Sequence, residues 1–167
     1  MATLQQEAPA QTVPFTQRDA GYQAFLMLRI AFSVAPILFG LDKFANVLTD
    51  DWTRYLSDTF NSLLPGSAAT GMHIVGVVEI VAGLVVAVAP RFGGYLVAAW
   101  LGGIILNLLL VGGYGDIALR DFGLMLAALT LTRLAVAADA ETVTESRSRE
   151  LRLQHDGQLV EGDRLPA

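Results

Sequence analysis

The sequence predicts an all-α integral membrane protein, a bundle of four membrane-spanning helices with one amphipathic interfacial helix between the first two spans. Of its 167 residues, 53% are hydrophobic and only 16% are charged, whereas an ordinary soluble domain has about 25% charged residues. The apolar residues are gathered into four blocks, and each block has the roughly 20 residues that a helix needs to cross a bilayer. Because backbone groups in lipid must bond to one another, each block is expected to be helical.

The four blocks set the expected order of the bundle. The first contains Arg29 and Pro36, and the second contains Glu79. Only "PRFG" separates the second block from the third, and "GGYGD" joins the third to the fourth, so tight antiparallel hairpins are expected at both places. The spans are predicted at about 22–44, 68–89, 92–113 and 117–138.

The connection between the first two spans is longer and amphipathic. Its segment "DDWTRYLSDTFNSLL" places apolar side chains on one helical face and predicts a helix at about 50–64. Thr49 or Asp50 could cap this helix, and Pro65 and Gly66 would end it. Tryptophan and tyrosine beside membrane spans favour a helix lying in the interface, and packing as a lid on the bundle is compatible with that position.

The two ends of the chain are polar. Residues 1–20 are expected to form a flexible segment before the bundle at 21–138, and residues 139–167 form a charged tail. The tail could continue as a helix, form a hairpin around Asp156 and Gly157, or be disordered. Arginines are more frequent on the side of the termini, which predicts that both termini are cytoplasmic.

The chain lacks the residues that several kinds of chemistry require. The chain has no cysteine, which excludes disulfides, thiolate catalysis and iron–sulfur ligation. His73 and His155 lie far apart in the sequence, so a histidine-based metal or haem site is not expected, and no flavin or nucleotide fingerprint is present. There is also no basic patch suited to nucleic acid. These observations argue against an enzyme and predict no intrinsic cofactor and no metal site.

Glu79 is the only charged residue of the second span. Such a charge near the bilayer centre costs about 2.5–3.5 kcal/mol on insertion scales, so it needs a partner in the bundle. Counting residues places Ser33 at a similar depth, and Arg29 lies one turn further toward the termini. The sequence therefore predicts an Arg29–Glu79 pair. The pair could be purely structural or could take part in proton or ligand handling.

A second polar group is expected at the opposite, outer side of the bundle. Its charged and amide residues come from three spans, and aromatic residues from the connections accompany them. The group could consist of ordinary interface charges or could form a ligand, quinone or lipid head-group site, and His73 is interpreted as an interface residue. The candidate residues are Asp42, Lys43, Trp52, Tyr55, Asn107, Tyr114, Asp116, Arg120 and Asp121.

Three segments carry a resemblance to a known family. They are "LRIAFSVAPILFGLDKF" (28–44), "VEIVAGLVVAVAPRFGGYLVA" (78–98) and "RDFGLMLAALTLTRLA" (120–135). Together they make residues 22–138 resemble the DoxX-like family of small bacterial four-helix membrane proteins. The long outer connection and the charged tail have no place in the family pattern.

The resemblance implies a protein of the bacterial inner membrane. The family is named for a subunit linked to thiosulfate oxidation with quinone reduction. We therefore expect an accessory or assembly subunit of a larger respiratory or other electron-transfer complex, in contact with lipids and other membrane subunits. One alternative is a quinone-linked oxidoreductase component that binds quinone at the outer side. Another is a small transporter or a proton path through Glu79.

Overall fold

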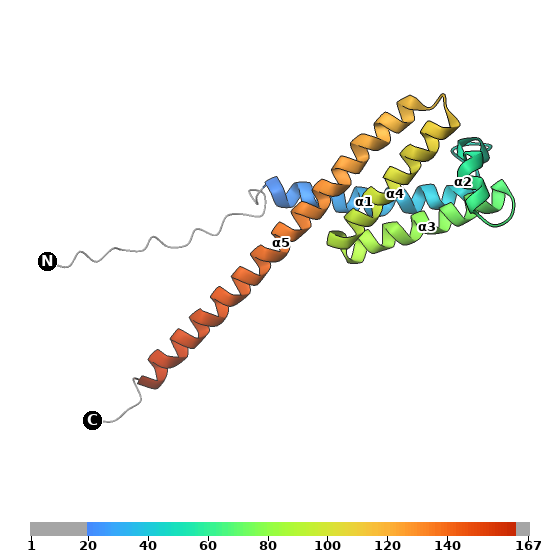
Figure 1. Ribbon diagram of the computed structural model, residues 1–167. Coiled ribbons are helices and arrows are strands. Elements are labelled where there is room, and N and C mark those ends of the chain that lie inside the picture. The colour runs from blue at the N-terminus through green and yellow to red at the C-terminus, as the bar shows by residue number, and fades with distance from the viewer. Residues whose placement is uncertain (1–19, 163–167) are drawn as a thin grey trace.

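Four long helices dominate the structure, a computed structural model that describes residues 20–162, with side chains to residue 154 (Figure 1). All four are long and apolar enough to cross a membrane. The prediction of a four-helix membrane bundle is thus confirmed, and the chain is a multi-pass membrane protein. The four helices are α1 (Ala20–Ala45), α3 (Ala68–Val88), α4 (Pro90–Val111) and α5 (Gly115–Gly162).

The helices pack as two antiparallel pairs, α1 with α3 and α4 with α5, and fewer contacts join one pair to the other. Glycines let the backbones approach closely within each pair. A Cβ atom on Gly83 of α3 would lie 2.6 Å from the Ser33 carbonyl oxygen of α1. A Cβ atom on Gly94 of α4 would lie 2.8 Å from the Ala128 carbonyl oxygen of α5. Close packing of small residues is what holds membrane helices together, since lipid tails supply no hydrophobic drive.

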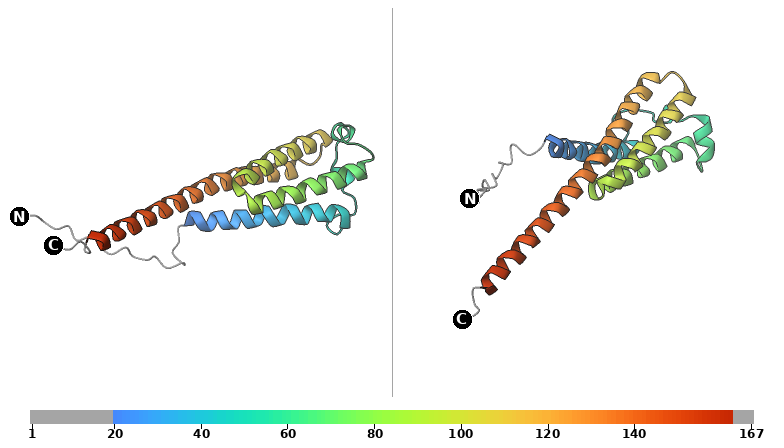
Figure 2. Two further views of the ribbon diagram at one scale, coloured as in Figure 1. Left: turned by 90° about the horizontal axis from the view of Figure 1, so that it is seen from below. Right: turned by 60° about the vertical axis from the view of Figure 1, so that its left-hand side comes forward.

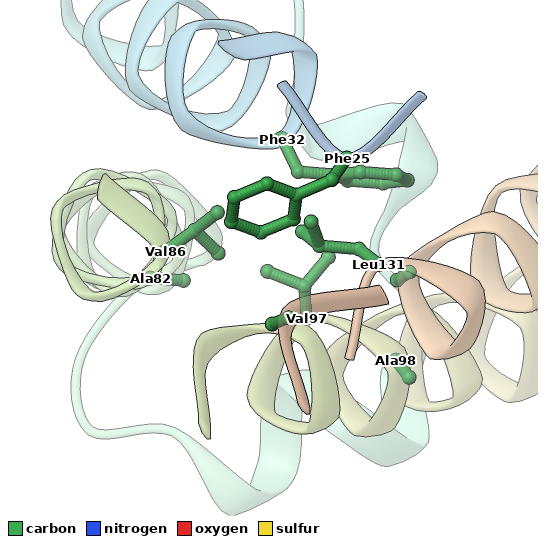
Figure 3. Packing of buried hydrophobic residues seen from close by; sticks show 9 residues of the cluster. Phe25, Phe32, Ala82, Val86, Val97, Ala98 and Leu131 are labelled. Carbon is green, nitrogen blue, oxygen red and sulfur yellow. The ribbon is translucent and has the colours of Figure 1, made fainter. Parts of the chain in front are cut away.

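The hydrophobic core lies toward the end of the bundle at which α1 begins. Figure 3 shows the Phe25 ring of α1 pointing toward Val86 of α3, and Phe32 of α1, Val97 of α4 and Leu131 of α5 complete the cluster. From this cluster the two helix pairs diverge toward the outer end, as Figures 1 and 2 show. The residues between the pairs at the outer end are therefore held together by something other than this core.

The connection between α1 and α3 is not the single helix predicted at about 50–64. It contains a short 3₁₀ helix, η2 (Thr53–Tyr55), and a six-residue helix, α2 (Asp58–Leu63). Leu56 and Ser57 between them have extended backbones, and Ser57 caps α2 by accepting a hydrogen bond from the Phe60 N–H. The cap is therefore Ser57, and Thr49 and Asp50, the predicted candidates, precede the first helical turn.

The physical reason for the break lies on α4. The Asn107 side chain bonds to the Tyr55 carbonyl and the Ser57 N–H. In a continuous helix both of these backbone groups would bond within the helix. The buried amide of Asn107 therefore replaces backbone hydrogen bonds of the predicted helix. The sequence of the connection alone does not reveal this replacement.

The α3–α4 and α4–α5 connections are as short as expected. Pro90 occupies the first position of α4, where its missing N–H would have had no partner in any case. Gly112 and Gly113 turn the chain into α5 with φ angles of 80° and 79°, a region that glycine enters at little cost.

The last helix continues well beyond the bundle (Figures 1 and 2). It runs to Gly162 without interruption, so Asp156 and Gly157 are helical and the hairpin interpretation of this region is wrong. Side chains 139–154 are all exposed. We call residues 139–162 the arm. The flexible segment predicted at 1–20 lies outside the described residues except for Ala20.

Candidate functional site: a polar centre beneath the outer connection

The register between α1 and α3 decides which charges can meet. Gly76 faces Gly40, and Gly83 faces Ser33. Ser33 is therefore level with Gly83, not with Glu79 as predicted, which is a displacement of four residues or about 6 Å along the helix. The displacement moves Arg29 away from Glu79 toward the inner end of α3.

Glu79 is paired with Lys43, so the predicted Arg29–Glu79 pair is wrong. The Lys43 ammonium lies 2.6 Å from the Glu79 carboxylate, and the two side chains are only 6% and 10% exposed. Lys43 belongs to the last turn of α1, and its four-carbon stem extends back along the bundle to reach the carboxylate. Pairing at this distance offsets the desolvation cost of burying the two charges, whereas either charge buried alone would be left uncompensated.

Arg29 serves the opposite end of the bundle. Its guanidinium donates a hydrogen bond to the Ala87 carbonyl in the last turn of α3 and lies 5.9 Å from the centre of the Phe25 ring. Carbonyls in the last turn of a helix have no intrahelical donor, and cations are favourable there. Arg29 therefore acts as a side-chain cap supplied by a neighbouring helix.

Asp42 organises the start of the outer connection. Its buried carboxylate accepts hydrogen bonds from the Val47 and Leu48 N–H groups and, at 3.1 Å, from the Trp52 indole. This holds the Trp52 ring over Lys43, with the ammonium 4.3 Å from the ring centre. A cation over an aromatic face is attracted to it, more strongly where water is excluded.

Asn107 organises the second half of the same connection from α4. Its side-chain oxygen accepts from the Ser57 N–H at 2.9 Å, and its side-chain nitrogen donates to the Tyr55 carbonyl. The Tyr55 ring then lies against Tyr114 of the α4–α5 turn, with ring centroids 5.1 Å apart. One buried amide thus fixes the connection to the second helix pair.

Of the three remaining predicted site residues, one is buried and two are exposed. Asp121 of α5 is only 5% exposed. It forms an ion pair at 3.1 Å with Arg120, whose side chain is 64% exposed. Asp116 is exposed and lies at the start of α5. The polar centre therefore includes Asp121 but not Asp116, and Arg120 reaches it only from the periphery.

Trp100 is a member of this centre that the sequence analysis did not identify. Gly93 contacts Val86, and continuing that antiparallel register brings Trp100 level with Glu79. The indole lies within electrostatic reach of the Glu79 carboxylate, yet its buried N–H has no acceptor in hydrogen-bond geometry. The available signal was its helical spacing, since Trp100 shares a stripe of α4 with Val97 and Asn107.

The structure thus brings together most of the residues predicted for the outer group and adds two to them. His73 remains apart from this set, exposed and stacked on Phe44 with ring centroids 4.8 Å apart. Among the described residues, no three His, Cys, Asp or Glu side chains are grouped so as to hold a metal ion. The polar centre consists of Asp42, Lys43, Trp52, Tyr55, Glu79, Trp100, Asn107, Tyr114 and Asp121.

The chemistry open to this centre follows from its pairings. Lys43 neutralises Glu79, Arg120 neutralises Asp121, and the polar groups of Asn107 bond to backbone. The buried Trp100 N–H lies beside the Glu79 carboxylate and makes no other hydrogen bond. The arrangement is suited to holding the two helix pairs together.

Comparison with known proteins adds no further assignment: no family model, curated protein or solved structure matches the chain. Its class therefore rests on the fold, which is that of a multi-pass helical membrane protein.

Proposed function

We propose that the chain is a non-catalytic accessory or assembly subunit of a larger complex in the bacterial inner membrane, as its resemblance to the DoxX-like family implies. The observation that carries the proposal is the arm, a helical extension of α5 on which every described side chain is exposed (Figure 1).

A helix of this kind needs support from outside itself. Isolated helices in water are only marginally stable, and most helical stability in proteins comes from packing of an apolar face. The arm has charges on most of its circumference, and its large apolar residues Val143, Leu151 and Leu153 are 67%, 60% and 66% exposed. Glu145 and Arg149, four residues apart, add only a few tenths of a kcal/mol. A partner protein with a matching charged surface would provide the missing contacts.

The polar centre supports a non-catalytic role. The buried carboxylates of Glu79 and Asp121 are compensated by Lys43 and Arg120, and that of Asp42 accepts hydrogen bonds from the outer connection. A general acid, base or nucleophile needs a group free to react with a substrate. We therefore assign the centre to assembly of the bundle.

We propose that the arm lies in the cytoplasm. Arg91, Arg133, Arg147 and Arg149 lie on the same side of the bundle as the arm, and arginine-rich short segments mark the cytoplasmic side. The partner surface would accordingly be the cytoplasmic face of a membrane complex.

Native purification tests the proposal. The tagged full-length chain and a chain ending at residue 138 would be extracted from their own membrane in mild detergent. We expect a stoichiometric partner with the full chain and its loss with the truncated chain. A control variant, Thr130→Ala at an exposed position of α5 within the bundle, should retain the partner. Recovery of the full-length chain as a lone bundle would contradict an accessory role.

A second candidate is a component that binds quinone, or a lipid head group, in the polar centre. The observation favouring it is the buried Trp100 N–H, a donor suited to a carbonyl oxygen. The chain has two tryptophans, so Trp52→Phe leaves Trp100 as the only indole emitter. Saturable quenching of that emission by a short-chain ubiquinone in nanodiscs, against an unresponsive lipid-only titration, would support quinone. Quenching that rises linearly without saturation would count against a site.

A further inference from the structure

We propose that the outer connection, residues 46–66, is a strap that gates access from the outer side to the buried Lys43–Glu79 pair. It does so by bridging the two helix pairs. We call these residues the strap. The inference goes beyond subunit assembly and is independent of it, because it concerns a movement within this chain.

The strap is held by two buried polar side chains, one from each helix pair. Asp42 of α1 accepts from the Leu48 N–H at 3.1 Å and from the Trp52 indole. Asn107 of α4 accepts from the Ser57 N–H at 2.9 Å. Asp42 is 6% exposed and Asn107 is 9% exposed. These two side chains therefore form polar pins that connect α1–α3 with α4–α5 through the strap.

Other attachments of the strap are weaker. Val47 and Leu48 are 80% and 64% exposed, so this part of the strap buries little apolar surface. Its two helical turns are short, and the backbone between them is extended. Segments with few buried apolar contacts and exposed backbone open locally at low free energy. The first part of the strap has these properties, whereas Leu56 and Leu64 further along it pack near Gly71 of α3.

The ends of the strap are marked by changes of backbone direction. Asn46 has a φ of 52° directly after α1, and Gly66 has a φ of 90° just before α3. Between them the strap crosses the outer end of the bundle, next to the α4–α5 turn in Figure 1 and in both views of Figure 2. Rotation at these two ends would lift the intervening segment without disturbing either span.

The Trp52 ring is the part of the strap that seals the polar centre. It lies over the Lys43 ammonium, which is itself bonded to Glu79. When the pins release, Trp52 leaves with the strap and water reaches the ion pair from the outer side. Since Asn107 also fixes the Tyr55 backbone, opening frees the outer end of the second helix pair from the first.

The chain offers a direct readout of this movement because Lys43 is its only lysine. The full-length protein in lipid nanodiscs would be treated with a membrane-impermeant amine-reactive ester. Mass spectrometry of the peptide containing Lys43 separates its modification from that of the N-terminal amine. We expect slow modification in the wild type, because this side chain is buried.

Weakening one pin should speed the modification. Asn107→Leu removes both hydrogen bonds to the strap, because it replaces the amide with an apolar side chain of similar size. Losing both bonds should raise the open fraction and the modification rate roughly 5- to 150-fold. The matched control is Asp51→Asn, which changes an exposed strap residue that bonds only within the strap, to Thr53. Its rate should equal that of the wild type.

A closure experiment keeps the proposal falsifiable if Asn107→Leu fails to fold. The protein has no cysteine, so Tyr55→Cys and Tyr114→Cys can be joined by a short, cleavable thiol cross-linker across a contact whose ring centroids are 5.1 Å apart. We expect modification of Lys43 to fall below the wild-type rate and to recover on cleavage. Fast modification unaffected by the cross-link would overturn the gate, as would an unchanged rate in folded Asn107→Leu.

Discussion

Replacing Lys43 by methionine tests the main correction that the structure makes, the identity of the partner of Glu79. The substitution keeps an unbranched side chain of similar length but leaves the Glu79 carboxylate buried without its cation. The removed contact is a 2.6 Å charged hydrogen bond between side chains that are 6% and 10% exposed. Breaking such a pair from one side costs about 3–5 kcal/mol. We expect a loss of this size in the free energy of unfolding.

A double-mutant cycle isolates the interaction. Adding Glu79→Gln to Lys43→Met removes the unpaired charge, so the double variant should be more stable than Lys43→Met and give a coupling energy of about 2–3 kcal/mol. The same cycle with Arg29→Met should give a coupling within about 0.5 kcal/mol of zero, because Arg29 bonds to Ala87. Unfolding would be followed by circular dichroism during titration of mixed micelles with a denaturing detergent.

The reasoning would be refuted by the opposite pattern of couplings. Strong coupling of Glu79 to Arg29, with weak coupling to Lys43, would restore the pairing that residue counting suggests. A cost below about 1 kcal/mol for Lys43→Met would show that the carboxylate is adequately hydrated without its partner.

Three further outcomes are expected. Gly94→Val should destabilise the bundle by about 1–3 kcal/mol or more because a Cβ would meet the α5 backbone, whereas Gly103→Val, with no atom within 4 Å, should be nearly neutral in the same detergent titration. Hydrogen bonds from Thr53 lower the pKa of the exposed Asp51 carboxyl. The contact is therefore fully present above the unfolded pKa of about 3.9 and is lost as the pH falls through the lower folded pKa. NMR of the Thr53 amide can follow this loss. An amide shift that titrates only above the unfolded pKa would contradict the contact. Deleting 139–167 should leave the unfolding free energy of the bundle within about 0.5 kcal/mol, and a larger loss would show that the arm packs on the spans.

The candidate site was only partly accessible to sequence reasoning. Asp42, Lys43 and Asn107 were recognised because polar residues near the outer ends of spans are few and conspicuous. Trp100 was missed because an indole within an apolar run has the same pattern as a core residue. Asp116 and Asp121 both lie at the start of the fourth span, yet one side chain is exposed and the other is buried. The facing direction of a side chain at a helix end depends on the packing of that end.

The sequence by itself determined the class of the protein and the approximate limits of its spans. Length and continuous hydropathy are enough for that, because a bilayer requires every backbone group of an apolar segment to bond within a helix. It also determined that Glu79 must have a partner. The tertiary structure decided which partner, because glycines at the α1–α3 contact set an axial register about 6 Å from the one that residue counting gives. It likewise decided that the outer connection breaks at Leu56 and Ser57, since an amide from a helix 50 residues away replaces the local hydrogen bonds. Both outcomes depend on contacts between distant segments, which periodicity along one segment does not contain.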